Sequence, residues 1–180
     1  TPFFLWGVFF VFKENRSGLE LKFFEIATKV VNENDLELYD LEWNTSSGDL
    51  CLYIMNKETK TAVLDDCVKI DRAMSPYIDD ETWIPENLTL EVSSPGLFRH
   101  LNQVNHFKMS VGEEVSLTLV KKIDDEQSPD FPRALRNNMK IKVKLVAAND
   151  EGIEIEAKGV VVKLPYTQIK RANLETNINY

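Results

Sequence analysis

Apolar positions recur at helical spacing in two stretches of the first half of the chain. Residues 19–31 place an apolar side chain at every third or fourth position, which predicts a helix with one buried face. Ser17 and Glu20 have the spacing of a capping box, in which each side chain satisfies an amide at the helix start. Residues 64–78 predict a second helix, although Pro76 lacks an amide hydrogen and should kink or loosen its last turn.

Around these helices the apolar spacing falls to two, as in half-buried strands. Strands are predicted at residues 36–43, 50–55 and 88–92. The first half is therefore predicted to be an α+β domain with the order α-β-β-α-β, two helices on a three-stranded sheet. The side chains expected on one buried face of the first strand are Tyr39, Leu41 and Trp43.

The second half carries short alternating stretches, which predict an all-β domain. Residues 149–152 and 158–159 have the composition of tight hairpin turns, and residues 165–168 should form one helical turn before the last strand. Residues 122–138 form a polar excursion that is long enough for a mobile binding loop. Five short strands in this arrangement describe an SH3/Sm-like five-stranded barrel. The strands are predicted at residues 114–121, 139–147, 153–157, 160–164 and 170–174.

The first twelve residues form an uncharged apolar run that stands apart from both domains. The run is too short to cross a bilayer of roughly 30 Å, which needs about 20 helical residues. It also lacks the basic flank and the cleavage site of a signal peptide. We interpret residues 1–16 as an apolar tail of uncertain origin, with a lipid contact as the alternative, and expect no membrane partner. The domains are predicted at residues 17–97 and 98–180.

Charge is unevenly distributed between the two halves. The chain has a net charge of −8, yet residues 1–98 hold 8 Lys and Arg against 18 Asp and Glu, whereas residues 99–180 hold 13 against 11. Because acidic surfaces repel phosphate, we expect RNA contact in the second half and attraction of a basic protein by the first. General solvation would explain the acidic surface equally well. The acidic residues considered are Glu37, Glu42, Asp79, Asp80, Glu81 and Glu86.

Residues 131–149 contain five cations and no acid. The lysines alternate with aliphatic residues, so a strand would place the ammonium groups on one face and the aliphatic side chains in the core. This pattern suits a phosphate backbone, and no aromatic residue is interleaved for base stacking. An ordinary solvated strand face is the competing interpretation. The predicted RNA or ribosome contacts are Arg133, Arg136, Lys140, Lys142 and Lys144.

The run Ser93-Ser94-Pro95-Gly96 precedes Arg99 and His100 and could suggest a nucleophile beside a base. Nucleophilic catalysis needs a base oriented by a third group and a serine on a sharp exposed turn, and the sequence lacks that context. Pro95 and Gly96 instead favour a turn that ends the third strand and sets the angle between the domains. We therefore expect no catalytic residues.

Neither the cysteines nor the histidines predict a metal site. Cys51 and Cys67 lack C-x-x-C spacing, which argues against a disulfide scaffold and a zinc site and favours a reducing cytoplasm. His100 and His106 stand six positions apart with no matching carboxylate motif. No metal and no other cofactor are expected.

Four segments of the chain resemble, in order and spacing, the ribosome maturation factor RimP family. The resemblance implies a cytoplasmic, non-catalytic factor of ribosome biogenesis with an α+β domain and an Sm-like barrel. Such a factor binds the free small ribosomal subunit and assists its assembly, with ribosomal RNA and a basic small-subunit protein as partners; we expect a monomer. The segments are LELYDLEW at 36–43, VLDDC at 63–67, DRAM at 71–74, and LEVSSPGL at 90–97 followed by Arg99.

Two other classes of function remain open from the residues alone. The first is a general Sm-like RNA-binding regulator, which would work as a ring of subunits rather than as a single chain. The second is a hydrolase that uses Ser94, His100 and a nearby acid.

Overall fold

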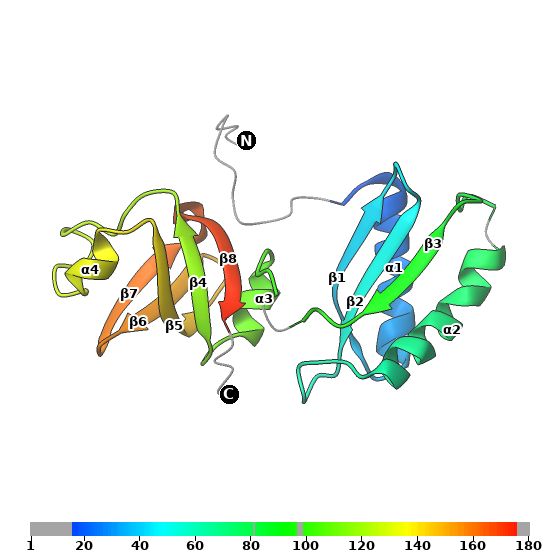
Figure 1. Cartoon of the computed structure of the whole chain (residues 1–180), viewed down its shortest axis with the longest axis horizontal. Coiled ribbons are helices and arrows are strands. Elements are labelled where there is room, and N and C mark those ends of the chain that lie inside the picture. The colour runs from blue at the N-terminus through cyan, green and yellow to red at the C-terminus, as the bar shows by residue number, and fades with distance from the viewer. Residues whose placement is uncertain (1–15, 81, 97–98, 176–180) are drawn as a thin grey trace. The chain divides into compact units, whose positions relative to one another are not determined.

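The computed structural model describes residues 16–80, 82–96 and 99–175 (Figure 1). The described residues divide into two compact units, an N-terminal unit of residues 16–96 and a C-terminal unit of residues 99–175. The predicted apolar tail lies outside the described residues except for Arg16, whose guanidinium bonds to Asp40 and to the carbonyl of Leu41. Within the described ranges no helix is both long and apolar enough to cross a membrane.

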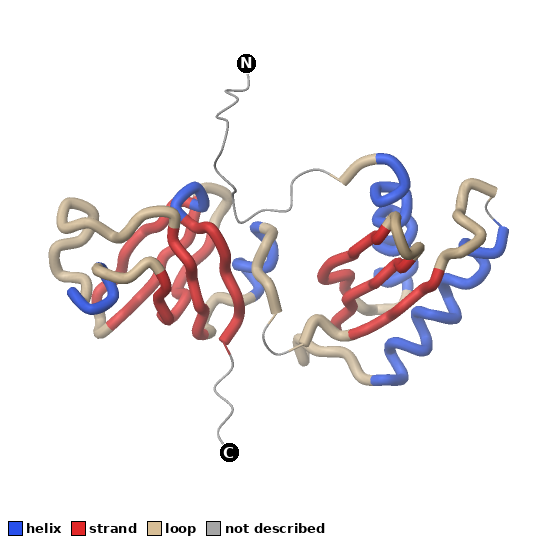
Figure 2. Tube along the Cα trace, turned by 45° about the horizontal axis from the view of Figure 1, so that its top comes forward, coloured by secondary structure: helices blue, strands red, loops and turns tan. Residues whose placement is uncertain are grey.

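The N-terminal unit has the predicted order α-β-β-α-β. Strand β1 is antiparallel to β2, which is parallel to β3, and the sheet order is β1-β2-β3. Alternate residues of β2 enter the same core as the apolar faces of both helices, so the helices cover one face of the sheet (Figure 2). The elements are α1 (Gly18–Glu33), β1 (Glu37–Asn44), β2 (Asp49–Met55), α2 (Leu64–Asp80) and β3 (Thr89–Ser93).

Two local predictions for this unit are wrong. Ser17 occupies the N-cap position of α1 but makes no capping hydrogen bond, and the Glu20 carboxylate pairs with Arg16 at 2.6 Å instead. The pairing of β1 with β2 shifts by one residue between Leu38 and Asp40. Tyr39 is the extra residue of this bulge; it is buried but lies outside the core cluster, against which the partly buried Leu38 packs instead.

Helix α2 continues through Pro76 and ends at Asp80, two residues beyond the predicted end. Proline has no amide hydrogen to donate to the carbonyl four residues earlier. The residue directly before the proline, Ser75, donates its hydroxyl to the carbonyl of Asp71 at 3.2 Å. Ile70 and Met74, which face the sheet ahead of the proline, are fully buried, so this part of the helix is held by the core.

The C-terminal unit contains five antiparallel strands in the order β7-β6-β5-β4-β8. All five lie close to their predicted positions, as does the short helical turn before the last strand. Strands β7 and β8 are at opposite ends of the order and form no ladder with each other in the described ranges, so the sheet is not closed as a barrel would be. The elements are α3 (Val104–Met109), β4 (Glu114–Leu119), α4 (Arg133–Arg136), β5 (Lys140–Ala148), β6 (Gly152–Ala157), β7 (Val160–Pro165), η1 (Tyr166–Gln168) and β8 (Ile169–Glu175).

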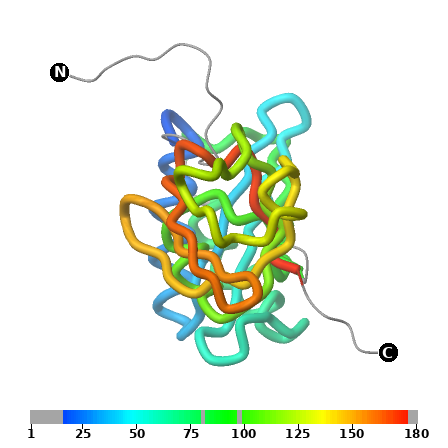
Figure 3. Tube along the Cα trace, turned by 90° about the vertical axis from the view of Figure 1, so that its left-hand side faces the viewer, coloured from blue at the N-terminus to red at the C-terminus, as the bar shows by residue number. Residues whose placement is uncertain are grey.

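The excursion between β4 and β5 is anchored to the core of this unit. Its apolar residues Ile123 and Phe131 are buried, and its last part forms the short helix α4. The excursion lies toward the viewer in Figure 3, in yellow-green and yellow. Helix α3, which the sequence pattern did not predict, contributes the fully buried Phe107 to the same core.

Candidate nucleic-acid interface

Strand β5 has the alternation that its sequence predicts. Lys140, Lys142 and Lys144 are exposed, whereas the aliphatic residues between them are buried in the core of the C-terminal unit. The ammonium groups therefore share one side of the sheet, because successive side chains of a strand point to opposite faces.

The neighbouring strands define what surrounds these lysines. Residues directly opposite each other in an antiparallel pair lie on the same face. Row by row across β5, β4 and β8, this outer face consists of Lys140, Thr118 and Arg171, then Lys142, Ser116 and Asn173, and then Lys144, Glu114 and Glu175.

Positive charge on the outer face is concentrated at its Lys140 end. The Lys142 ammonium pairs with the Glu175 carboxylate at 3.0 Å. Lys144 lies in register between Glu114 and Glu156. The Lys140 row holds only the neutral Thr118 and a second cation, and its cations form no ion pair with any described residue. An anion would therefore meet the least carboxylate charge at this end.

The two arginines predicted as contacts differ in their surroundings. Arg133 is exposed on the short helix α4. The side chain of Arg136 is only 14% exposed and forms an ion pair with Asp125 of the same excursion. Arg136 therefore holds the excursion in place and is poorly accessible to a partner, in contrast to Arg133.

The predicted interdomain segment is divided between the two units. Ser93 ends β3, its hydroxyl donates to the carbonyl of Ser94 at 3.3 Å, and Gly96 has a φ of +76° that suits glycine in a turn. Arg99 belongs to the C-terminal unit, where its carbonyl accepts a hydrogen bond from the amide of Leu174 at 2.9 Å.

Residues 99–101 pair with the end of β8 through a single β-bridge. The amide of Leu101 donates to the carbonyl of Ala172 at 2.9 Å, and His100 and Asn173 form a β-bridge. Their side chains also meet on the outer face, with 3.0 Å between Asn173 Nδ2 and His100 Nδ1. The segment thus covers the edge of β8, which sequence reasoning did not anticipate.

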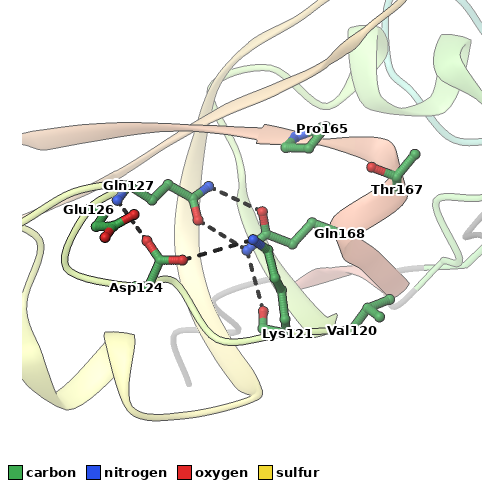
Figure 4. Close-up of a pocket in the computed structure, with 8 residues that line it drawn as sticks. All are labelled: Val120, Lys121, Asp124, Glu126, Gln127, Pro165, Thr167 and Gln168. Atoms are coloured by element: carbon green, nitrogen blue, oxygen red, sulfur yellow. Dashed lines mark hydrogen bonds and ion pairs between the residues drawn. The ribbon is translucent and has the colours of Figure 1, made fainter.

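A polar pocket of about 620 Å³ lies between the excursion and the turn before β8 (Figure 4). The side-chain amides of Gln127 and Gln168 bond to each other in both directions, at 3.1 and 3.2 Å. Gln127 also donates to the carbonyl of Lys163 on β7 at 3.0 Å. Since Asp124 and Glu126 line the same pocket, it disfavours phosphate, and its amide pair fastens the excursion to the sheet.

The sheet of the N-terminal unit presents acidic groups on the side away from its helices. We call this surface, formed by Glu42, Asp49, Cys51, Tyr53 and Glu91, the acidic face. Its three β2 residues alternate with the buried residues of that strand, and Glu42 and Glu91 stand in register on either side of Cys51. Glu42 was among the predicted acidic residues, whereas Glu81 lies outside the described residues.

Hydrogen bonds on the acidic face bind its neutral groups to its carboxylates. The Tyr53 hydroxyl donates to Glu42 at 3.3 Å, and burial together with Glu42 raises the pKa of Tyr53 to about 12. The Cys51 thiol donates to Glu91 at 3.6 Å, and burial and Glu91 raise the pKa of this thiol. Both groups are therefore neutral near pH 7, and the carboxylates set the sign of the face.

Within the described residues no three potential metal ligands come together. The His106 ring accepts a hydrogen bond from the backbone amide of Asn102 at 3.3 Å, which gives that buried ring a structural role.

Residues 26–98 match the family model of the RimP N-terminal domain. The chain contains a RimP N-terminal domain. This match confirms the resemblance to RimP proteins that the four segments predict. RimP proteins are ribosome maturation factors, generally without catalytic activity. The match covers most of the N-terminal unit, which carries the acidic face, and stops just before the C-terminal unit.

One RimP-like segment, VLDDC at 63–67, has a clear structural role at the start of α2. Val63 precedes the helix and has no side-chain acceptor for the first helical amides. Asp66 compensates in part, because its carboxylate accepts the backbone amide of Val63 at 3.0 Å. Asp65 and Asp66 also lie in the first turn, where acidic side chains stabilise the positive end of a helix.

Proposed function

We propose that this RimP-family protein acts in the cytoplasm as a monomer that binds the free small ribosomal subunit and assists its assembly without catalysis. In this proposal the outer face of the C-terminal unit contacts ribosomal RNA, and the acidic face of the N-terminal unit docks a basic small-subunit protein. The observation that carries it is the coexistence in one chain of a RimP N-terminal domain and of a second unit whose sheet concentrates cations at one end.

The outer face supports a backbone contact rather than sequence readout. Lys140, Arg171 and Arg133 are exposed cations, and such side chains displace counterions from phosphates. The three rows of the outer face contain no aromatic residue on which a base could stack. Contacts of this kind position a protein on folded RNA and leave its choice of site to shape and to other partners.

The acidic face supports attraction of a basic protein. Glu42 and Glu91 are exposed on either side of Cys51, which belongs to the central strand of the sheet. Opposite charges across an interface speed the encounter of two proteins and disfavour wrong partners. A basic ribosomal protein meets this requirement, whereas RNA does not.

The alternative of a ring-forming Sm-like regulator would require free sheet edges for pairing between subunits. Residues 99–101 cover the β8 edge, and at the other end of the sheet Gln127 bonds to the carbonyl of Lys163 and Pro165 lacks an amide donor. Protected edges of this kind disfavour strand pairing between chains. A native mass of one chain would agree with the proposal, and a hexamer would favour the regulator.

Sedimentation of cell lysate through sucrose gradients tests the proposed function. The protein should migrate with free small-subunit particles at low salt and dissociate as salt rises. The triple variant Lys140→Glu/Lys142→Glu/Lys144→Glu should bind these particles more weakly while keeping its fold. Failure of the wild-type protein to migrate with the particles at any salt concentration would refute the proposal. Unchanged migration of a folded triple variant would remove only the role of the lysines.

A further inference from the structure

A small groove lies on the C-terminal unit where residues 99–102 run beside β8. It has a volume of about 180 Å³ and no acidic residue in its lining. The two other pockets described on this unit contain carboxylates, Asp124 and Glu126 in one and Glu151 and Glu154 in the other. The groove is lined by His100, Leu101, Asn102, Lys170, Arg171 and Ala172.

A bulge in β8 brings two cations to this groove. Thr118 of β4 stands opposite Arg171, and the next residue, Leu119, stands opposite Ile169, so Lys170 has no partner in β4. A bulge of this kind re-aims side chains, because it interrupts the regular alternation of a strand. Lys170 and Arg171 are both exposed, and neither forms an ion pair with a described residue.

The groove continues the cationic end of the outer face. Arg171 belongs to the same row as Lys140, with Thr118 between them. Two strand spacings of about 4.8 Å separate the backbones of Lys140 and Arg171 by about 10 Å. The cations therefore form a track that crosses β5, β4 and β8 and ends beside the segment that enters the C-terminal unit.

We propose that this groove binds a backbone phosphate of RNA, with Lys170 and Arg171 as the two cations. This inference rests on the proposed function, since it names a further part of the surface that meets ribosomal RNA. Arg171 offers several donors in a fixed fork to phosphate oxygens, and Lys170 adds a point charge. The β8 bulge and residues 99–102 give the groove its walls.

The test compares two double variants with equal charge change. Lys170→Gln/Arg171→Gln removes the groove cations. Lys108→Gln/Lys163→Gln removes two exposed cations of the same unit that already pair with Asp150 and Glu154. Binding of a short fluorescein-labelled RNA duplex to the full-length proteins is followed by fluorescence anisotropy over a range of salt concentrations, and thermal unfolding checks that both variants fold.

The groove variant should bind the duplex about tenfold more weakly at low salt. The magnitude of its slope of log K against log salt should fall by about 0.9, because the protein no longer neutralises the one phosphate that the groove holds. The control variant should keep the wild-type slope within about 0.5. These results together would establish the groove as part of the RNA-binding surface.

Three results would overturn the inference: a wild-type slope in the folded groove variant, an equal loss in the control, or the absence of RNA binding by the wild-type protein. A fourth would be that inorganic phosphate, at matched ionic strength, raises the unfolding temperature of the wild type but not of the groove variant while both bind the duplex equally, which would assign the groove to free phosphate. Failure to migrate with small-subunit particles, combined with the expected slopes, would refute the proposed function and leave the groove intact.

Discussion

The acidic face and the outer face are built by the same backbone rule and carry opposite charge. In each, one side of a sheet closes a core of aliphatic side chains, and the alternate residues are left for solvent or a partner. On the acidic face, burial and the neighbouring carboxylates keep a tyrosine hydroxyl and a thiol in their neutral forms. On the outer face, cations and carboxylates share the rows unequally, which leaves one positive end. Net charge alone conceals this division, since it describes a chain and not a face.

The largest expected effect comes from reversing the acidic face. Glu42→Lys/Glu91→Lys should weaken binding to a labelled oligo-arginine peptide by about 100-fold, because like charges would meet across the interface. Affinity for RNA should not fall. The matched control is Glu25→Lys/Glu33→Lys, which makes the same charge change at exposed positions of α1, on the helical side of the sheet. Equal loss in both variants would show that overall charge acts, and not the face.

The next effect separates Lys140 from Lys144, the first and last of the exposed lysines along β5. Lys140→Glu should reduce affinity for an RNA duplex about tenfold at low salt, because it places a carboxylate among cations. Lys144→Glu should reduce it less and should instead lower the free energy of unfolding by about 0.5–1 kcal/mol, since it aligns with Glu114 and Glu156. Anisotropy and urea denaturation measure the two quantities. Equal losses of RNA affinity would contradict the charge gradient.

The alternation of β5 was predictable from sequence because three exposed and three buried positions alternate without interruption. The bulges at Tyr39 and Lys170 were not, because one extra residue changes the register without changing composition. Helix α3 was missed since it spans only Val104–Met109 and has no side-chain cap at Gln103. Short helices without capping residues give little local signal.

The ion pairs that neutralise some of the predicted contact residues could not be predicted from the local sequence. Lys142 forms an ion pair with Glu175 and lies in the same row as Asn173. Both of these residues are more than thirty positions away from it along the chain. Arg136 meets Asp125 across the excursion. The Lys170-Arg171 pair was visible in the sequence, but only the pairing of β8 with β4 aligns Arg171 with Lys140.

A third and smaller effect compares one tyrosine from each unit at alkaline pH. Burial, aided by Glu42 for Tyr53 and by Asp150 for Tyr166, raises the pKa of each to about 12 from 10. The unfolded chain then loses the phenol proton first, so the stability from each neutral hydroxyl is complete below pH 10 and is lost as pH rises to about 12.

Tyrosine-to-phenylalanine variants should flatten this alkaline loss of unfolding free energy. Tyr166→Phe should also cost about 1 kcal/mol at neutral pH, because the Tyr166 hydroxyl donates to the carbonyl of Asn149 at 2.8 Å. Tyr53→Phe should cost less, since its bond to Glu42 is longer and solvent-exposed. Urea denaturation between neutral and alkaline pH measures both. An unchanged alkaline slope in both variants would contradict the assigned cause.

The smallest effect tests whether Glu175 neutralises Lys142, by replacing each residue of this exposed ion pair in turn. Loss of this pair in Lys142→Gln should change the free energy of unfolding by less than about 0.5 kcal/mol and hardly change RNA affinity, because Glu175 already neutralises the lysine. Glu175→Gln should act in the opposite sense: it releases Lys142 to the outer face, so RNA affinity should rise a few-fold and the salt slope should steepen by about 0.9. A carboxylate whose removal left RNA binding unchanged would mean that the middle row of the outer face lies outside the RNA contact, and that the cationic track is confined to Lys140 and the residues beside it.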